Sequence, residues 1–319
     1  MNSENLHTIS IVVPVFRNEE TLVELYSALK KISLTLSYEF RFIFVNDGSD
    51  DRSEVILREL AQSDKTILVL TLSRNFGQVA AIFAGLNECE GDATIIMSAD
   101  LQEPVNLIPK MISAWKEGSE IVIANRTERS DGLFSRATSS FFYSLIRYSN
   151  PGLPEGGFDF VLLGRNAVAA LKKIKNRNRF LQGDILWLGF ETRFIPYERE
   201  PRLKGKSQWS FSKKIKYLLD GIFSTSYWPI RMMSLLGFST AFSGFVYILI
   251  IVYMRIMHQT PFNGWAPIMV VMLFLGGVIM IMLGITGEYL WRIYDEVRGR
   301  PEYIVKKKIS GDEDSNRPD

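Results

Sequence analysis

Two polar side chains, Asp100 and Gln102, closely follow an apolar run at residues 95–97, and Pro104 closes the turn. In open α/β sheets, ligands bind just beyond the carboxyl ends of the strands, so these two side chains are expected to face a substrate. Carboxylate and amide oxygens are hard ligands that suit Mg²⁺ or Mn²⁺. The turn therefore predicts a metal ion, held by Asp100 and Gln102, that bridges the phosphates of a nucleotide.

A second carboxylate, Asp47, follows another apolar run in the tripeptide Asp47-Gly48-Ser49. At the end of a strand, such a carboxylate suits the base or ribose of a nucleotide, and Gly48 allows the chain to approach closely. The same tripeptide is common in turns and helix caps that bind no ligand. Its position after a buried strand favours nucleotide binding.

Charged residues further along the chain suit phosphate groups. Arg126 ends an apolar run and can pair with a diphosphate or, alternatively, form a surface ion pair. Asp159 lies between two phenylalanines, which indicates a carboxylate that faces a cleft. A basic loop at residues 202–209 suits a phosphate head group at a lipid surface, and non-specific binding of anionic lipid is the alternative. Its candidate ligands are Arg202, Lys204, Lys206 and Ser207.

The elements that would position these residues alternate between strand and helix. Short β-branched runs predict strands over Ile9–Val15, Phe40–Asn46, Ile67–Ser73, Ala93–Ser98 and Ile121–Asn125. Helical patterns begin near Asn18, Ser53, Gln78 and Leu107. This alternation predicts an α/β fold with a doubly wound, mostly parallel sheet. The chain has neither a G-x-G-x-x-G nor a P-loop motif, which argues against a dinucleotide fold and P-loop phosphoryl transfer.

The C-terminal third predicts a two-helix transmembrane hairpin. No charged residue occurs over 232–254 or 256–287, and each stretch is as long as the about 20 apolar residues that a membrane span needs. We place the spans near Leu235–Met254 and Pro267–Tyr289; two buried helices of a soluble domain are the alternative. Basic residues flank the hairpin, whereas only Arg255 lies in its turn. The positive-inside rule then predicts an integral inner- or plasma-membrane protein with both termini and the catalytic domain in the cytoplasm.

Composition and patterning narrow the remaining possibilities. The 319-residue chain has a net charge of only +2, so we expect no nucleic-acid partner. Aromatic and basic residues mix over 134–148 and 211–228, which favours helices at the membrane surface over helices that only cover a core. The last residues, from Ser310 to Asp319, are expected to form a disordered tail.

Several short motifs together resemble one known family. They are Val12–Val15, Asn18–Glu20, Val45–Ser49, Leu72–Gly77, Ala99–Pro104, Phe180–Gly183, Trp187–Phe190 and Arg202–Trp209. In this order they resemble family-2 glycosyltransferases of the branch that contains dolichyl-phosphate mannose synthases and bactoprenol glucosyl transferases. The resemblance extends from Thr8 to Arg300. It implies a GT-A, Rossmann-like catalytic domain and transfer of a sugar from a nucleotide sugar to a polyprenyl phosphate lipid.

The resemblance also assigns roles and domains. It places Pro14, Glu19 and Asp47 in the substrate site, and Asp100 and Gln102 at the metal and diphosphate. It places Asp159 near the donor sugar. The residues that it places at phosphate groups are Arg126, Arg136 and the 202–209 loop. The implied parts are a nucleotide-sugar-binding half (1–133), an acceptor-side part with interfacial helices (134–230), the hairpin (231–291), and a cytoplasmic basic segment with the tail (292–319).

Three positions depart from the family pattern. Ser98 stands where the family usually has the first Asp of Asp-x-Asp, Val161 replaces a usual Arg, and Gln208 replaces a common Lys. Mg²⁺ is commonly bound through one or two carboxylates plus substrate phosphates. We therefore expect Asp100 to suffice for the metal, with Ser98 acting through water.

The acceptor constrains the mechanism. A phosphomonoester has a second pKa of about 6, so the lipid phosphate is already a nucleophile at neutral pH and needs little help from a base. Asp159 is therefore expected to orient the substrate or to stabilise positive charge at the anomeric carbon. The metal and arginine neutralise the leaving diphosphate. Direct attack by the lipid phosphate inverts the anomeric centre.

Two other functions stay open at this point. Ser98 is compatible with a membrane-tethered subunit that binds nucleotide sugars without transferring them. A processive polysaccharide synthase is disfavoured, because the chain lacks Gln-x-x-Arg-Trp and has only two predicted spans. The residues do not specify the sugar. UDP is the preferred nucleotide because the resemblance is to bacterial proteins, and the terminal helices would permit a homo-oligomer.

Overall fold

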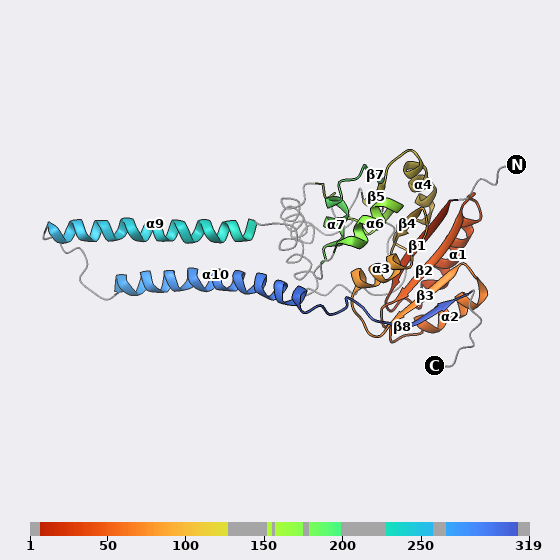
Figure 1. Ribbon diagram of the computed structural model, residues 1–319, viewed down its shortest axis with the longest axis horizontal. Helices are drawn as coiled ribbons and strands as arrows, with labels where there is room; N and C mark the ends of the chain where they lie inside the picture. Colours follow the sequence, from red (N-terminus) through yellow and green to blue (C-terminus); the bar gives the residue numbers. More distant parts are fainter. Residues whose placement is uncertain are drawn as a thin grey trace. The chain divides into compact units, whose positions relative to one another are not determined.

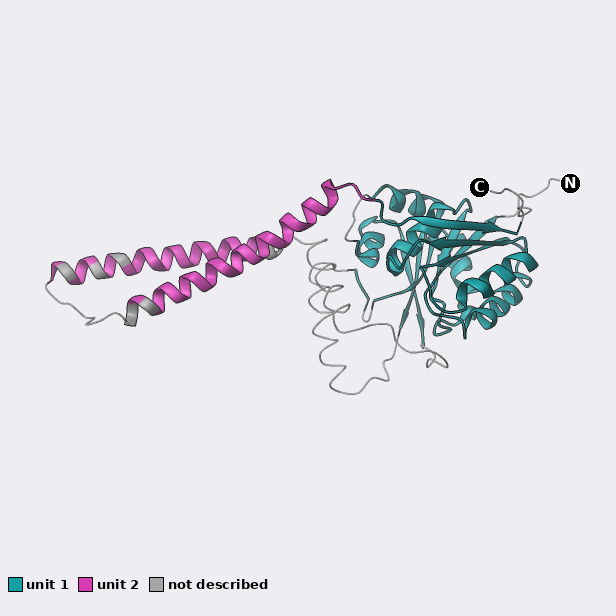
Figure 2. Ribbon diagram, turned by 90° about the horizontal axis from the view of Figure 1, so that it is seen from below, with its two compact units in different colours: residues 1–218, 301–319 teal, residues 219–300 magenta. Residues whose placement is uncertain are grey.

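The structure is a computed structural model that describes residues 7–126, 152–154, 157–174, 179–198, 228–257 and 266–311 (Figure 1). The chain divides into two compact units, which Figure 2 shows in different colours. Unit 1 combines residues 1–218 with residues 301–319, and unit 2 contains residues 219–300. The C-terminal segment therefore belongs to the same unit as the N-terminal half.

Unit 1 is built on a mixed sheet whose strands, within the described residues, run in the order β7-β5-β6-β4-β1-β2-β3-β8. They are β1 (Thr8–Val15), β2 (Glu39–Asn46), β3 (Ile67–Leu72), β4 (Ala93–Ile96), β5 (Ile121–Arg126), β6 (Phe160–Gly164), β7 (Thr192–Tyr197) and β8 (Val305–Ser310). Strands β4, β1, β2 and β3 are parallel neighbours, as are β5 and β7. Strand β6 is antiparallel to β4 and β5, and β8 is antiparallel to β3. The predicted α/β fold with a mostly parallel sheet is confirmed.

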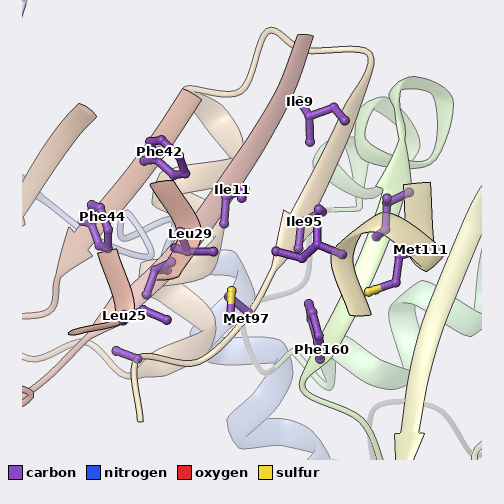
Figure 3. Close-up of a cluster of buried hydrophobic side chains, with 14 of the residues drawn as sticks. Ile9, Ile11, Leu25, Leu29, Phe42, Phe44, Ile95, Met97, Met111 and Phe160 are labelled. Atoms are coloured by element: carbon purple, nitrogen blue, oxygen red, sulfur yellow. The ribbon is translucent and has the colours of Figure 1, made fainter. Parts of the chain in front are cut away.

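Three helices and a short 3₁₀ helix cover one face of the sheet. They are α1 (Leu22–Ser33), α2 (Ser53–Ser63), η1 (Val105–Leu107) and α4 (Ile108–Lys116). Figure 3 shows Leu25 and Leu29 of α1 and Met111 of α4 among apolar side chains of the strands, including Ile11 and Ile95. Each such side chain contributes roughly 1.5–3 kcal/mol when it is fully buried.

The opposite face is covered by α3 (Gln78–Asn87), α6 (Arg165–Lys173) and α7 (Leu181–Trp187). Val12 and Val45 of the central strands pack there against Ala81 and Ala84 of α3. Because successive residues of a strand point to opposite faces, the continuous apolar runs 11–13 and 42–45 supply both cores. This double burial holds the carboxyl ends of the strands in fixed positions.

The five strands that the sequence predicts are all present, whereas β6, β7 and β8 were not predicted. Ser310, which was expected to begin a disordered tail, is instead the last residue of β8 and pairs with Leu68 of β3. Strand β8 contains three consecutive lysines and is mostly exposed. The strand is stabilised by pairing with the apolar strand β3 and not by burial of its own side chains. Its sequence therefore lacks the apolar pattern by which a strand is recognised.

Within the described residues, unit 2 consists of the helices α9 (Trp228–Ile256) and α10 (Ala266–Val297). The two helices lie side by side (Figures 1 and 2), and Gly237 of α9 faces Met282 of α10. The candidate membrane spans are Ile230–Met254 and Val270–Val297. In the most apolar part of each span, 0% and 6% of the residues, respectively, are buried. Core helices of a soluble domain would be mostly buried, so the exposure favours the transmembrane hairpin. The predicted interfacial helices, at 134–148 and 211–228, lie outside the described residues apart from Trp228.

Candidate active site

Strand register brings Arg126 and Asp159 together at the edge of the sheet that is formed by the carboxyl ends of its parallel strands. Ala124 of β5 pairs with Phe160, the first residue of the antiparallel strand β6. Arg126 therefore extends past the start of β6, to the place where Asp159 precedes that strand. The Nη2 atom of Arg126 donates a hydrogen bond to Oδ2 of Asp159 at 3.0 Å. The Arg126 side chain is 13% exposed and the Asp159 side chain 41%, so the carboxylate faces solvent and the guanidinium lies behind it.

The surroundings of Arg126 keep its guanidinium charged. Burial acts to lower the pKa of Arg126, but the charges of Asp159 and Tyr197 act against it, and the pKa is raised overall. Tyr197 lies opposite Arg126 in the parallel pairing of β5 with β7. Among the described residues, the buried Nε atom of Arg126 has no hydrogen-bond partner. The site thus holds a fixed cation beside a half-exposed carboxylate, which suits a substrate with a diphosphate.

The turn after β4 gathers three oxygen-bearing side chains. The hydroxyl of Ser98 donates to Oδ1 of Asp100 at 3.2 Å, and the backbone N–H of Gln102 donates to the same atom at 3.3 Å. Between them Leu101 adopts a positive φ of 59°, which is unusual for a bulky residue and bends the chain sharply. Ser98 thus contacts Asp100 directly.

The donor set of this turn fits a divalent metal that the substrate helps to bind. Asp100 supplies one carboxylate, and Gln102 and Ser98 supply neutral oxygens. Within the described part of the chain, no group of three or more His, Cys, Asp and Glu side chains could hold a metal by itself. Mg²⁺ is commonly bound through one or two carboxylates together with substrate phosphates. The turn suits such a shared site and not an all-protein cage.

A buried carboxyl group, Glu103, lies behind this turn. Its Oε2 accepts the backbone N–H of Ser98 at 2.7 Å, and its side chain is almost fully buried. Burial, and next to it the charge of Asp159, raises the pKa of Glu103 to about 7. The carbonyl of Ala99 is held by the hydroxyl of Thr21, at 2.6 Å. The conformation of the turn is therefore fixed from both sides by buried hydrogen bonds.

Asp47 joins the end of β2 to the turn that precedes α3. Its two carboxylate oxygens accept the backbone N–H groups of Phe76 and Gly77, at 2.7 and 2.9 Å. Gly48, at φ 65°, lies so close to this turn that an added Cβ would come within 2.5 Å of the Arg74 backbone. Asp47 is only 2% exposed, and it holds together the loops that follow β2 and β3.

A family model described as "Glycosyl transferase family 2" matches residues 10–172, which contain most of β1, all of β2 to β6, and both residues of the Arg126–Asp159 pair. The chain belongs to glycosyl transferase family 2. The match, together with the observed sheet, confirms the GT-A-like fold that the motifs implied, and it shows that the protein is a glycosyltransferase.

Relatives of this glycosyltransferase cover nearly the whole chain. The SfII prophage-derived bactoprenol glucosyl transferase of Shigella flexneri is 39% identical over 95% of this chain and 99% of its own length. An uncharacterised glycosyltransferase of Bacillus subtilis, YkcC, is 38% identical over 93% of each chain. Among solved structures, glucosyl-3-phosphoglycerate synthase of Mycobacterium tuberculosis is 15% identical, with a TM-score of 0.48 over 67% of this chain and 80% of that one.

The other predicted site residues of the glycosyltransferase fall into two groups. Pro14 is the penultimate residue of β1. Proline has no N–H to donate, but its nitrogen faces the side of β4, whose pairing with β1 has already ended at Val12. No hydrogen bond between strands is therefore lost at Pro14. Glu19 follows β1 and accepts the backbone N–H of Arg52 at 2.9 Å, which links the loops after β1 and β2. The second group lies outside the described residues: Arg136, Arg202, Lys204, Lys206 and Ser207.

Three residues at this edge could not be recognised from the sequence. Tyr197 lies in the unpredicted strand β7, and Glu103 belongs to the turn after β4 but cannot be told from an exposed glutamate in the sequence. Gln182 of α7 donates from Nε2 to the carbonyl of Phe158, at 2.6 Å, directly before Asp159. Gln182 lies inside the Phe180–Gly183 motif, which could have marked it as a candidate site residue, but the motif alone indicates no role.

Proposed function

We propose that this glycosyltransferase transfers a hexose from a UDP-sugar to a polyprenyl phosphate, with undecaprenyl phosphate as the acceptor, at the cytoplasmic face of the membrane. The observation that carries the proposal is 39% identity, over 95% of the chain, to a protein named bactoprenol glucosyl transferase. An alignment of that length includes both candidate membrane spans. A lipid acceptor is the simplest reason for a soluble-type catalytic fold to be joined to such a hairpin.

Asp100 and Gln102 are the proposed ligands of Mg²⁺ or Mn²⁺. Such an ion, when bound, neutralises charge on the diphosphate that leaves with the nucleotide. Ser98 is proposed to act on the ion through water, while its hydroxyl contact at 3.2 Å also orients the Asp100 carboxylate. One carboxylate of the usual pair is absent, so we expect weaker metal binding than in family members with Asp-x-Asp.

Arg126 is the proposed cation for the diphosphate, and Asp159 the proposed carboxylate beside the donor sugar. Their hydrogen bond at 3.0 Å fixes the guanidinium before any substrate arrives, which is the arrangement that electrostatic stabilisation requires. The lipid phosphate is a dianion near neutral pH, with a second pKa of about 6, so Asp159 is not needed as a base. Its role in this proposal is to orient the sugar or to stabilise positive charge at the anomeric carbon.

The proposed reaction is one displacement. An oxygen of the lipid phosphate forms a bond to the anomeric carbon as the bond from that carbon to the nucleotide diphosphate breaks. The configuration of the anomeric carbon is inverted. Asp47, Pro14 and Glu19 are proposed to contact the nucleotide portion, and Arg136 and the 202–209 loop to hold phosphate groups.

A transfer assay with the full chain in detergent tests the proposal. Undecaprenyl phosphate is offered with a panel of UDP- and GDP-sugars and Mg²⁺ or Mn²⁺, and the lipid fraction is examined by mass spectrometry. We expect a single lipid-phosphate-hexose product that requires a UDP-sugar and disappears with EDTA. No product from any donor, with nucleotide binding intact, would contradict the proposal and favour a subunit that only binds nucleotide sugars.

A further inference from the structure

The segment that follows the membrane hairpin is tied to the catalytic unit by a partly buried ion pair. Glu302 accepts two hydrogen bonds from Arg179, from Nε at 3.1 Å and from Nη2 at 2.8 Å. The Arg179 side chain is only 7% exposed, and its guanidinium lies over the ring of Phe83 in α3, at 3.8 Å from the centroid. A paired, stacked arginine of this kind has little freedom to move.

Arg179 stands directly before α7, whose first turn contacts the backbone next to Asp159. Gln182, in that turn, donates from Nε2 to the carbonyl of Phe158 at 2.6 Å. Its amide also fills the space above Gly157, where an added Cβ would come within 2.6 Å of Oε1. Gly157 has a φ of 66°, so the chain turns sharply just before Asp159.

These contacts form a continuous connection from Glu302, through Arg179 and the start of α7, to the peptide group that precedes Asp159. We propose that Glu302, Arg179 and Gln182 are positioning residues that hold the Asp159 carboxylate against Arg126. In this way the segment returning from the membrane hairpin completes the catalytic site. The proposal rests on the proposed function only in assigning Asp159 a part in sugar transfer.

The physical reason is the position of Asp159 directly after the turn at Gly157 and Phe158, to which Gln182 is hydrogen-bonded. The Asp159 side chain is 41% exposed and accepts a hydrogen bond from Arg126. The direction of the carboxylate therefore depends on the backbone at Gly157 and Phe158, which Gln182 holds. A displacement of about 1 Å at a reacting group can reduce a rate about 10²-fold.

Two variants and a matched control test this connection. Glu302→Gln removes the charge that pairs with Arg179 but keeps the size of the side chain. Gln182→Met removes the donor to Phe158 and keeps the volume. Lys308→Gln is the control, because it breaks another ion pair of the same returning segment, the one between β8 and Glu88 at the end of α3, at 2.6 Å.

Hydrogen exchange measures the positioning without any need for turnover. In the full chain in detergent, we expect faster amide exchange in peptides covering 157–160 for Glu302→Gln and Gln182→Met. Lys308→Gln is expected to exchange there as the wild type does. Unchanged exchange in the first two variants overturns the inference, whether or not the protein transfers a sugar. Failure of the proposed function is recognised separately, by wild-type protein that yields no lipid product.

Kinetics then test whether the positioning matters for transfer. We expect kcat to fall about 10–100-fold in Glu302→Gln and Gln182→Met, while KM for the nucleotide sugar changes less than about threefold. Because both act on one connection, the double variant should lose less than the product of the two single losses. Variants that lower Tm but leave kcat unchanged would assign the pair a purely structural role and contradict the inference.

The variant Gln182→Glu supplies a pH signature that a structural role would not give. A protonated glutamic acid can donate to the Phe158 carbonyl as the amide does, whereas the carboxylate cannot. Burial favours the protonated form, so the variant's activity relative to wild type should rise from pH 8 to pH 6. A constant ratio across this range contradicts the role of Gln182 as a donor.

Discussion

Arg126 donates a hydrogen bond to Asp159 at 3.0 Å although 33 residues separate them in the sequence. The antiparallel strand β6 lies between β4 and β5, so its first residue starts at the edge where those two strands end. The carboxylate of Asp159, directly before β6, is therefore brought beside the guanidinium of Arg126, at the end of β5. The same edge carries the turn of Asp100, and the two features together form the site from which our predictions follow.

Replacing Arg126 by lysine should impair transfer strongly, although the charge is kept. A lysine lacks the planar guanidinium with its several N–H donors, so it cannot contact a diphosphate and Asp159 in the same geometry. We expect kcat/KM to fall about 10²–10³-fold, comparable with the loss of one donor at a developing negative charge. Arg193→Gln is the control, since it breaks an exposed pair with Glu117. Transfer by Arg126→Lys at the rate of the control would exclude Arg126 from the diphosphate site.

Ser98→Asp should strengthen metal binding. The substitution restores a second carboxylate next to Asp100, and affinity for hard divalent ions rises with the number of charged ligands. We expect a lower Mn²⁺ concentration for half-maximal binding, measured by electron paramagnetic resonance in the presence of UDP. Ser98→Ala, which removes the hydroxyl contact to Asp100, should shift it the other way. Equal Mn²⁺ affinity in all three proteins would show that position 98 is not at the metal.

Asp47 should be important for stability as well as for substrate binding. Asp47→Ala leaves two backbone N–H groups, of Phe76 and Gly77, without their buried acceptor. Each such loss costs about 1–3 kcal/mol, so we expect a clear fall in Tm. Asp47→Asn keeps one acceptor oxygen and should lose about half as much. A Tm equal to wild type in Asp47→Ala would mean that these two hydrogen bonds do not stabilise the fold.

Stability should depend on pH through Asp184 of α7. Burial raises the pKa of Asp184 from 3.8 to about 6. The folded protein then binds more protons than the unfolded chain between these two values, so the contribution of Asp184 to stability falls as pH rises through that window. The shift corresponds to at most about 3 kcal/mol. Asp184→Asn carries no charge, so its Tm relative to wild type should be higher at pH 7.5 than at pH 4.5. The same difference at both pH values would contradict this.

Sequence patterns were sufficient for strands β1 to β5, which are largely buried on both faces, although they did not reveal the equally buried strand β6. The runs at 11–13 and 42–45 are continuously apolar, a pattern that only a doubly covered parallel strand requires. Asp47, Asp100 and Arg126 could be recognised because each lies at the end of such a strand or shortly after it. Strand β8 could not, since three lysines give it no apolar pattern and its partner β3 lies over 200 residues away.

The parts of the site that the sequence did not reveal depend on burial and on distant contacts. Glu103 and Gln182 are polar residues whose neighbours are set by the fold, and nothing in their type distinguishes them from exposed residues. The ion pair of Arg179 with Glu302 joins positions 123 residues apart. Single-sequence periodicity reports only local structure, so such pairs become visible only in three dimensions.

The most direct test of the account compares wild type with Asp100→Ala in one assay. Full-length protein in detergent is given undecaprenyl phosphate, a UDP-hexose and Mn²⁺, and the lipid-phosphate-hexose product is measured by mass spectrometry. We predict product from the wild type that is lost with EDTA, and none above background from Asp100→Ala, whose folding is checked by Tm. Full metal-dependent transfer by Asp100→Ala would contradict the metal site, and no product from wild type with any sugar would contradict the proposed reaction.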